Sequence, residues 1–192
     1  MKKIKLIAIV GPAGSGKDTI LKEVVKRNPE WHKIVNYTSR PQRENELNHY
    51  NYHFVNRDEF LKMVAADEML EYNEFNHWFY GTSISDLNKE KINVGVLNPS
   101  GIRKIKRMYD DEIDMKVYRI DAHDKERLLR QLNREKIPNI DEIFRRYYAD
   151  KIDFSYEYLN AFTTIYPLSN HTEEDIKRCV DFICEYTTFG QN

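Results

Sequence analysis

Cysteine is scarce in this sequence of 192 residues, and neither sign of charge is in clear excess. The two cysteines, Cys179 and Cys184, are too few for a disulfide scaffold or a thiolate zinc site, and they fit a reducing cytosol. Lys and Arg number 30 against 31 Asp and Glu, which gives a net charge of −1. Proteins that bind nucleic acid or membrane surfaces usually carry a basic excess. We therefore expect a cytoplasmic protein with neither partner, and the oligomeric state stays open.

Long apolar segments are also missing. No run reaches the roughly 18–20 residues that a membrane-spanning helix needs. Residues 1–10 briefly resemble a signal peptide, but a glycine-rich loop follows their short apolar run instead of a cleavage site. Hydrophobic residues make up 41% and charged residues 32%, which is typical of a folded globular chain. The length fits one domain over residues 1–192.

Strand-like apolar runs alternate with helix-like spacing along the chain. Strands are predicted at residues 6–10, 94–97, 115–120 and 162–166. Helices are predicted from 17 to the Asn28-Pro29 stop, around 60–64, 102–108 and 128–132, from 141 to about 159, and at 173–186. The alternation predicts an α/β fold of the P-loop NTPase type, a parallel sheet flanked by helices. Residues 36–82, rich in Tyr, Asn, His and Arg, are interpreted as a segment inserted beside the carboxyl edge of the sheet.

The glycine-rich loop carries the clearest chemical signal. It follows a predicted strand and opens a predicted helix, which is the context that a P-loop requires. Glycines let successive backbone N–H groups point at a phosphate, and the helix N-terminus adds partial positive charge. The lysine supplies a cation for the β- and γ-phosphates. The predicted phosphate-binding residues are Gly11, Ala13, Gly14, Ser15, Gly16, Lys17, Asp18 and Thr19.

Asp18 departs from the P-loop motif, which has Ser or Thr at this position to bind Mg²⁺. An anionic side chain beside phosphates is repelled unless a cation lies between them. We therefore interpret Asp18 as a Mg²⁺ ligand, directly or through water. An ordinary first-turn acid of the helix is the alternative, and the sequence leaves both open.

The segment after residue 36 adds arginines, tyrosines and an isolated glutamate. Arg40 and Arg43 flank Pro41, and arginine forks suit phosphate oxygens. Tyrosine hydroxyls can complete a clamp on a monophosphate, and Glu71 can accept two N–H bonds from a guanine-like base edge. Each residue alone has an ordinary explanation in solvation or packing, so the interpretation rests on the combination.

In this combination the chain resembles the guanylate kinase family of nucleoside monophosphate kinases. The family's arginine pair, Tyr-x-Phe, Glu and Tyr-Gly-Thr/Ser occur here in order, and the resemblance continues more weakly to the C-terminus. It implies a phosphotransferase of nucleotide metabolism that transfers the γ-phosphoryl group of ATP, bound with Mg²⁺, to GMP or dGMP. It also implies an acceptor site whose phosphate is bound by Arg40, Arg43, Tyr52 and Tyr80, and whose base is read by Glu71 and Thr82.

Three positions depart from the family pattern. Asn36 stands where the family commonly has a base-reading Ser, and Val96-Leu97-Asn98 replaces an Asp-x-Asp stretch. Val96 cannot hold Mg²⁺, and Asp18 is our candidate for the missing carboxylate. Asn98 can accept a hydrogen bond from a base amino group, but it is uncharged and can also donate. Because losing a charged hydrogen bond costs roughly 1.5–3 kcal/mol, a deoxynucleotide or modified-base acceptor, as in some viral kinases, is an open alternative.

Arginines around Pro138 resemble the mobile lid of the family, over residues 125–149. The resemblance implies that Arg134 and Arg146 act with Lys17 on the transferred phosphoryl group. The ordinary alternative is ion pairing on helix surfaces, as Glu126–Arg130 and Glu142–Arg146.

Two other functions stay open. One is a non-catalytic interaction module of the family, although such modules typically lose the phosphate loop. The other is a sugar-phosphate kinase, which has no need of Glu71 or the run at 80–82. The histidines lack metal-ligand spacing, and we interpret them as loop or packing residues.

Overall fold

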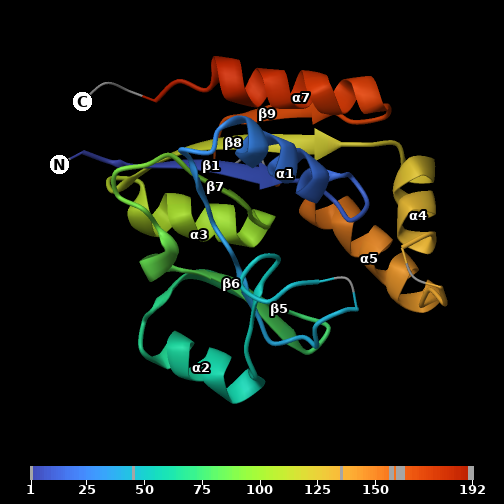
Figure 1. The fold of residues 1–192 in the computed structure, drawn as a ribbon. Coiled ribbons are helices and arrows are strands. Elements are labelled where there is room, and N and C mark those ends of the chain that lie inside the picture. Colours follow the sequence, from blue (N-terminus) through green and yellow to red (C-terminus); the bar gives the residue numbers. More distant parts are fainter. Residues whose placement is uncertain (1, 45, 135, 156–157, 159–162, 190–192) are drawn as a thin grey trace.

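The computed structural model describes residues 2–44, 46–134, 136–155, 158 and 163–189. Among these residues, five strands form a central sheet in which all paired strands run parallel (Figure 1). The strand order is β2 (His32–Lys33), β7 (Asn93–Val96), β1 (Ile4–Val10), β8 (Ile113–Asp121) and β9 (Ile165–Ser169). The predicted fold class, a parallel sheet flanked by helices, is therefore confirmed.

The alternating side chains of β1 explain why helices cover both faces of the sheet. Leu6 and Ala8 belong to one core cluster, and Ile7 and Ile9 belong to the other. The first cluster is closed by α3 (Pro99–Tyr109), and the second by α1 (Lys17–Arg27) and α7 (Glu173–Tyr186). Residues 6–10 are fully buried, so the N-terminal apolar run is a core strand, as predicted.

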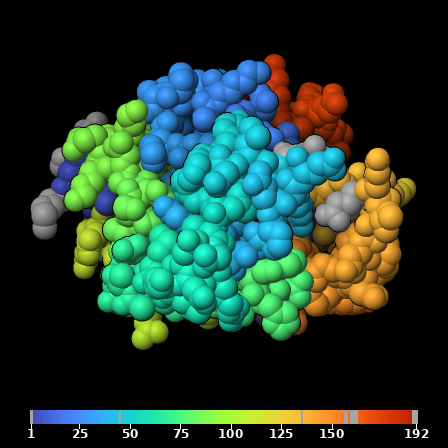
Figure 2. Space-filling model, turned by 60° about the horizontal axis from the view of Figure 1, so that its bottom comes forward, coloured from blue at the N-terminus to red at the C-terminus, as the bar shows by residue number. Residues whose placement is uncertain are grey.

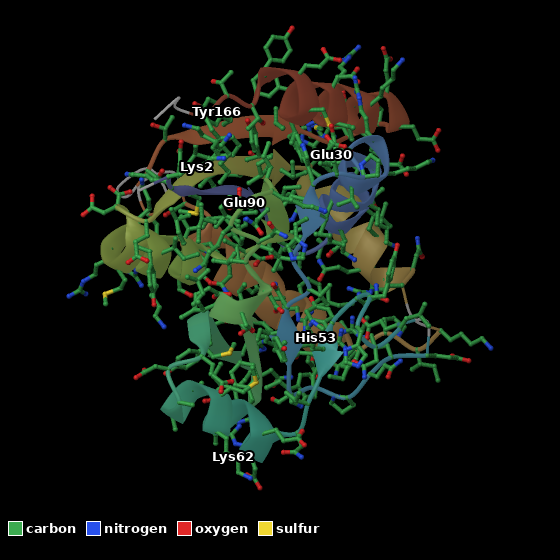
Figure 3. All side chains as sticks on the ribbon, turned by 60° about the vertical axis from the view of Figure 1, so that its left-hand side comes forward. Lys2, Glu30, His53, Lys62, Glu90 and Tyr166 are labelled. Atoms are coloured by element: carbon green, nitrogen blue, oxygen red, sulfur yellow. The ribbon has the colours of Figure 1, made fainter. Side chains whose placement is uncertain are left out.

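The segment at 36–82 builds a second sheet that apolar spacing does not predict. Its order is β4 (His53–Phe54), β3 (Tyr37–Thr38), β6 (Trp78–Ser83) and β5 (Met69–Phe75). The helix α2 (Arg57–Ala65) packs on this sheet through Phe60, which stacks on Phe79. A short 3₁₀ helix, η1 (Ile84–Asp86), leads back toward β7. His53 and Lys62 mark this part in Figure 3, at the opposite end of the molecule from Tyr166 on β9.

Two helices, α4 (Asp124–Leu132) and α5 (Ile140–Asp153), pack on each other beyond the carboxyl end of β8. They span most of the predicted lid segment. In Figure 2 they (orange) and the inserted segment (cyan to green) border the same face of the molecule. None of the helices in the described ranges is long and apolar enough to cross a membrane.

Two predicted boundaries near the C-terminus are wrong. The helix expected to reach about residue 159 ends at Asp153, because the backbone of Phe154 leaves the helical conformation. The strand expected at 162–166 instead covers Ile165–Ser169, since its hydrogen-bonded register with β8 runs from Val117 to Asp121. Residues 156–157 and 159–162, on which part of both predictions falls, lie outside the described residues.

Candidate active site

The loop between β1 and α1 has the conformation that its glycines permit. Gly14 and Gly16 have φ angles of +78° and +89°, which residues with side chains rarely adopt. Space is equally restrictive, since a Cβ on Gly14 would lie 2.4 Å from the carbonyl oxygen of Arg127. The helix α1 then begins at Lys17, with Gly16 as its N-cap. The loop thus combines a helix N-terminus with a lysine at the carboxyl end of the sheet, which is a phosphate-binding geometry.

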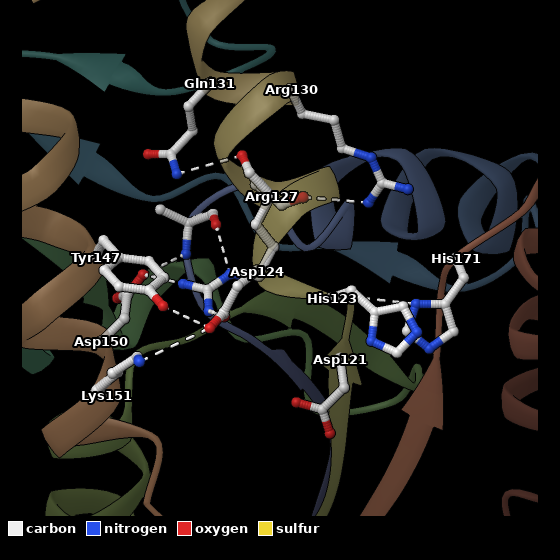
Figure 4. Close-up of polar contacts among 12 residues, drawn as sticks. Asp121, His123, Asp124, Arg127, Arg130, Gln131, Tyr147, Asp150, Lys151 and His171 are labelled. Carbon is white, nitrogen blue, oxygen red and sulfur yellow. Dashed lines mark hydrogen bonds and ion pairs between the residues drawn. The ribbon is translucent and has the colours of Figure 1, made fainter. Parts of the chain in front are cut away.

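Side chains from distant parts of the chain hold this loop from outside (Figure 4). Arg127 Nε and Arg130 Nη1 donate to the carbonyl oxygens of residues 13 and 14, each at 3.1 Å. Asn170 Nδ2 donates to the carbonyl oxygen of residue 15 at 2.7 Å. Because these donors bind carbonyl groups, they do not compete with an anion for the loop N–H groups, of which those of Ala13 and Ser15 are engaged by Asp150 and by the Pro12 carbonyl oxygen.

Asp150 connects α5 to the same loop. Its Oδ2 accepts the Ala13 N–H at 2.7 Å and Arg127 Nη2 at 3.0 Å. Burial raises the pKa of Asp150, although the Ala13 N–H and the charges of Arg127 and Lys17 favour the ionised form. The carboxylate therefore connects α5 and Arg127 of α4 to the phosphate loop.

Asp18 and the inserted segment face one another. A small cavity of about 50 Å³ is lined by Asp18 and Leu21 from α1, by Asn36 and Tyr52, and by Val96 at the end of β7. Burial raises the pKa of Tyr52 to about 12, and the negative charge of Asp18 adds to this effect. The first turn after the phosphate loop and the predicted acceptor site therefore share one cleft.

The predicted phosphate clamp is assembled around Arg40. This guanidinium is only 5% exposed, and it lies over the ring of Tyr52, with 5.2 Å from Cζ to the ring centroid. The ring of Tyr80 is 6.3 Å from that of Tyr52. Glu46 holds the arginine fork, accepting Arg40 Nη1 at 2.7 Å as well as the Arg43 backbone N–H at 3.0 Å.

Glu46 is thus a partner of the clamp that sequence reasoning missed. Burial alone would raise its pKa, but hydrogen bonds from Arg40 and from the Arg43 backbone outweigh this, and the pKa of Glu46 lies below its usual range. Its carboxylate is therefore the anion that satisfies the predicted phosphate-binding arginine.

Glu71 is buried at the other end of the acceptor segment. Its Oε1 accepts Thr82 Oγ1 at 2.8 Å, and Thr82 also lies 3.2 Å from Asn36 Oδ1. Burial raises the pKa of Glu71 to about 7, against hydrogen bonds from Thr82 and Asn98 that favour the carboxylate. A Cβ on Gly101 would lie 2.5 Å from Glu71 Oε2, so the glycine leaves room for this carboxylate. Three predicted base-reading residues, Asn36, Glu71 and Thr82, therefore lie in one hydrogen-bonded cluster.

Asn98 forms hydrogen bonds within the protein through both atoms of its amide group. Its Oδ1 caps α3, accepting the Gly101 N–H at 2.7 Å and Ser100 Oγ at 2.6 Å. Its Nδ2 donates to Glu71 Oε2 at 3.3 Å and to Asn73 Oδ1 at 3.1 Å. The oxygen expected to accept from a base amino group therefore has two donors within the protein, and the Asn98 amide group also positions Glu71. The contact of Asn98 with a base stays a prediction.

Within the described residues, neither predicted lid arginine donates a hydrogen bond to the phosphate loop. Arg146 donates to Glu142 Oε1 at 2.7 Å, the ion pair considered as the ordinary alternative, and its Cζ lies 5.1 Å from the ring centroid of Phe75. Arg146 precedes Asp150 by one helical turn, which places both on one face of α5. Arg134 is exposed, and its side chain has no hydrogen-bond or ion-pair partner within the described ranges. Their catalytic roles stay predictions.

Sequence reasoning placed Arg127 and Arg130 among the arginines of the lid, with a Glu126–Arg130 ion pair as the ordinary alternative. In the structure both arginines instead donate to carbonyl groups of the phosphate loop. Asn170, which also holds this loop, was missed. These residues follow the carboxyl ends of β8 and β9, and the fold places the phosphate loop at the same edge of the sheet. Their position after these strands could therefore have identified them as residues that contact the loop.

The fold and the phosphate loop define a nucleotide-binding protein of the P-loop class. The sequence model of the guanylate kinase family matches residues 3–183. A guanylate kinase of Prochlorococcus marinus subsp. pastoris is 30% identical over 190 residues, covering 95% of this chain and 99% of that protein. The chain therefore belongs to the guanylate kinase family, and the predicted family and enzyme class are confirmed.

Two further relatives agree. A guanylate kinase of another Prochlorococcus marinus strain is 29% identical, covering 93% of this chain and 96% of that protein. The crystal structure of guanylate kinase from Anaplasma phagocytophilum has a TM-score of 0.66 at 22% identity, covering 97% of this chain and 86% of that one. This structural likeness shows a shared fold.

Proposed function

We propose that this chain transfers the γ-phosphoryl group of ATP to GMP or dGMP, as a cytoplasmic enzyme of nucleotide metabolism. The observation that carries the proposal is the cavity lined by Asp18 on one side and by Asn36 and Tyr52 on the other. It brings the start of the phosphate-loop helix against the acceptor segment, and proximity of two bound substrates is the main requirement of phosphoryl transfer.

Arg40 would bind the acceptor phosphate together with Arg43, Tyr52 and Tyr80. Glu46 now provides the negative charge beside Arg40, at 2.7 Å from Nη1. A phosphate dianion carries more charge than this carboxylate and offers three oxygens to the planar fork. Acceptor binding then exchanges one anion for another without leaving a buried guanidinium unpaired.

Glu71 would read the base. A carboxylate accepts hydrogen bonds but donates none, so it pairs with the adjacent N–H and NH₂ groups of a guanine edge. Thr82 and Asn98 already hold both of its oxygens by donation, which fixes the orientation of the carboxylate. An adenine presents a different pattern of donors at that edge, and the buried Glu71 would be left without its partner.

The donor phosphates would lie on the loop N–H groups and Lys17, with Arg134 and Arg146 brought over them by movement of residues 125–149. The acceptor oxygen is already an anion, so no general base is needed. The protein contributes position and positive charge, and closure excludes water that would otherwise accept the phosphoryl group.

Asp18 and Thr19 would hold the Mg²⁺ that accompanies ATP. Both are exposed on the first turn of α1, and their oxygens suit a hard cation. When bound, the ion neutralises phosphate charge. Val96 and Asp18 line the same cavity. This supports the hypothesis that Asp18, on the first turn of α1, replaces the carboxylate that the family has at the end of β7.

An ADP-release assay across GMP, dGMP, AMP, CMP, dTMP and dUMP tests the proposal. We expect GMP and dGMP to dominate the rates. A preference for pyrimidine nucleotides would overturn the assignment of guanine as the acceptor base, but it would leave the proposed kinase activity intact. Absence of turnover with every acceptor would favour a non-catalytic interaction module. Lys17→Ala should abolish turnover, whereas Lys26→Ala, which removes an exposed lysine from the same helix outside the cavity, should not.

A further inference from the structure

Two imidazoles and a carboxylate meet beside the phosphate loop. His123 is the N-cap of α4, Glu126 lies in the first turn of that helix, and His171 lies two residues before α7. Their potential ligand atoms all lie within 4.8 Å of one another. Figure 4 shows the two rings face to face, with centroids 3.8 Å apart and planes inclined by 16°. We infer that these three side chains bind a divalent transition-metal ion of the Zn²⁺ class.

The sheet register explains why the two histidines meet. β8 and β9 are parallel neighbours, and Asp121 is paired with Ser169 at their carboxyl ends. The ladder continues for one more hydrogen bond, from the Asn170 N–H to the Asp121 carbonyl oxygen at 2.7 Å. His123 and His171 each follow the last paired residue by two positions, so both leave the sheet at the same height. Spacing along the chain does not reveal this pair, because its members come from different strand ends.

Glu126 completes the set through an unsatisfied oxygen. Its Oε2 is buried and has no hydrogen-bond partner among the described residues. The expected helix partner is engaged elsewhere, since Arg130 donates to the loop carbonyls and to the Asn170 carbonyl oxygen at 3.2 Å. A buried carboxylate oxygen without a donor is costly, and a cation between it and the two rings would satisfy it.

The donor set selects the kind of ion. Two imidazole nitrogens with one carboxylate match Zn²⁺, Co²⁺ or Ni²⁺, whereas Mg²⁺ and Ca²⁺ prefer oxygen ligands throughout. Ligands of a tetrahedral Zn²⁺ lie about 3.3 Å apart, so the side chains must close by a small rotation. The stacked rings must also turn until both nitrogens aim at one point, and His123, which is exposed, has room to do so.

Binding of the metal ion would break one existing hydrogen bond. His171 Nδ1 accepts the His123 backbone N–H over 3.3 Å, a long hydrogen bond that coordination would replace. The benefit extends to the phosphate loop, because His171 directly follows Asn170, whose side chain holds the loop carbonyl of residue 15. An ion shared by α4 and the turn before α7 therefore braces two of the elements that support the loop.

Titration of ZnCl₂ into the untagged, nucleotide-free chain tests the inference by calorimetry. We expect one Zn²⁺ per chain, a rise in the melting temperature on Zn²⁺ addition, and the visible spectrum of low-coordinate Co²⁺ when Co²⁺ is used instead. His171→Ala and Glu126→Gln should each weaken Zn²⁺ binding by at least about tenfold. Circular dichroism of each apo variant checks that it is folded.

The matched control is His49→Ala with His53→Ala. This second histidine pair, with its Nδ1 atoms 2.7 Å apart, lies in the acceptor segment. The control should keep the full Zn²⁺ affinity. If the wild type binds no Zn²⁺, or if binding survives His171→Ala and Glu126→Gln but is lost in the control, the inference is wrong. Neither result depends on phosphoryl transfer, so the proposed kinase activity is tested separately.

Discussion

Glu71→Gln should make the protein more stable at pH 8 while impairing its activity. A carboxyl group whose pKa rises from 4.5 to about 7 on folding keeps its proton in the native state at pH values where the unfolded chain has lost it. Stability therefore falls as the pH rises from 4.5 to 7 and then stays level. The ionised Glu71 costs about 3 kcal/mol at pH 8, and a neutral glutamine removes this cost.

Glu71→Gln also has a destabilising effect, which opposes part of this gain in stability. Glutamine keeps one acceptor for Thr82, but its NH₂ group then faces the donating amide of Asn98. The loss of one hydrogen bond lowers the free energy of unfolding by about 1 kcal/mol. The net gain of about 2 kcal/mol corresponds to a rise in melting temperature of about 4–8 °C for a domain of this size. Differential scanning calorimetry at pH 5 and pH 8 measures it, and the gain should nearly vanish at pH 5.

Activity should move in the opposite direction. Loss of a charged acceptor for the base costs about 1.5–3 kcal/mol, or about 10–100-fold in kcat/KM for GMP. In the wild type, kcat/KM should also fall below pH 7 as Glu71 is protonated, and this limb should disappear in the variant. Glu68→Gln, at an exposed site close by, is the control and should change neither property. A lower melting temperature for Glu71→Gln at pH 8 would refute the reasoning.

Three further changes probe the loop and the acceptor pocket. Asp150→Asn removes a partly buried charge that holds the phosphate loop, and we expect KM for ATP to rise about tenfold with little change for GMP, measured by steady-state kinetics. Asp18→Ser should weaken Mg²⁺ activation, and adding Val96→Asp should restore it; an unchanged Mg²⁺ titration in Asp18→Ser would exclude Asp18 as a ligand. Gly101→Ala places a Cβ 2.5 Å from Glu71 Oε2, so it should lower stability by about 1–3 kcal/mol in thermal unfolding and raise KM for GMP.

The central sheet is predictable because its strands are buried on both faces. A run such as residues 6–10 has no polar position, and the helices that cover it show a clear apolar face. The phosphate loop is predictable for a different reason. Gly14 and Gly16 have backbone conformations that residues with side chains rarely adopt, so the spacing of these glycines indicates the conformation of the loop.

The acceptor sheet could not be predicted in the same way. β3 and β4 are two residues long, too short to show alternation, and the local core reduces to Phe60, Met69 and Phe79. What identified this segment was chemistry: the order of arginines, tyrosines and a glutamate. Glu46 escaped notice because an acidic residue in a loop is ordinary until its partner Arg40 is seen to be buried.

The same two carboxylates show what the acceptor site requires of the fold. Glu71 is buried where its ionised form is disfavoured, and Glu46 satisfies an arginine that would otherwise lie unpaired in the clamp. Under the proposed function, both arrangements would improve on binding of a guanine nucleotide, because its base would offer N–H groups to Glu71 and its phosphate would offer a stronger anion to Arg40. The free protein would then sacrifice some stability at these two carboxylates, and the same free energy would contribute to its affinity for a ligand that carries both groups at the right separation.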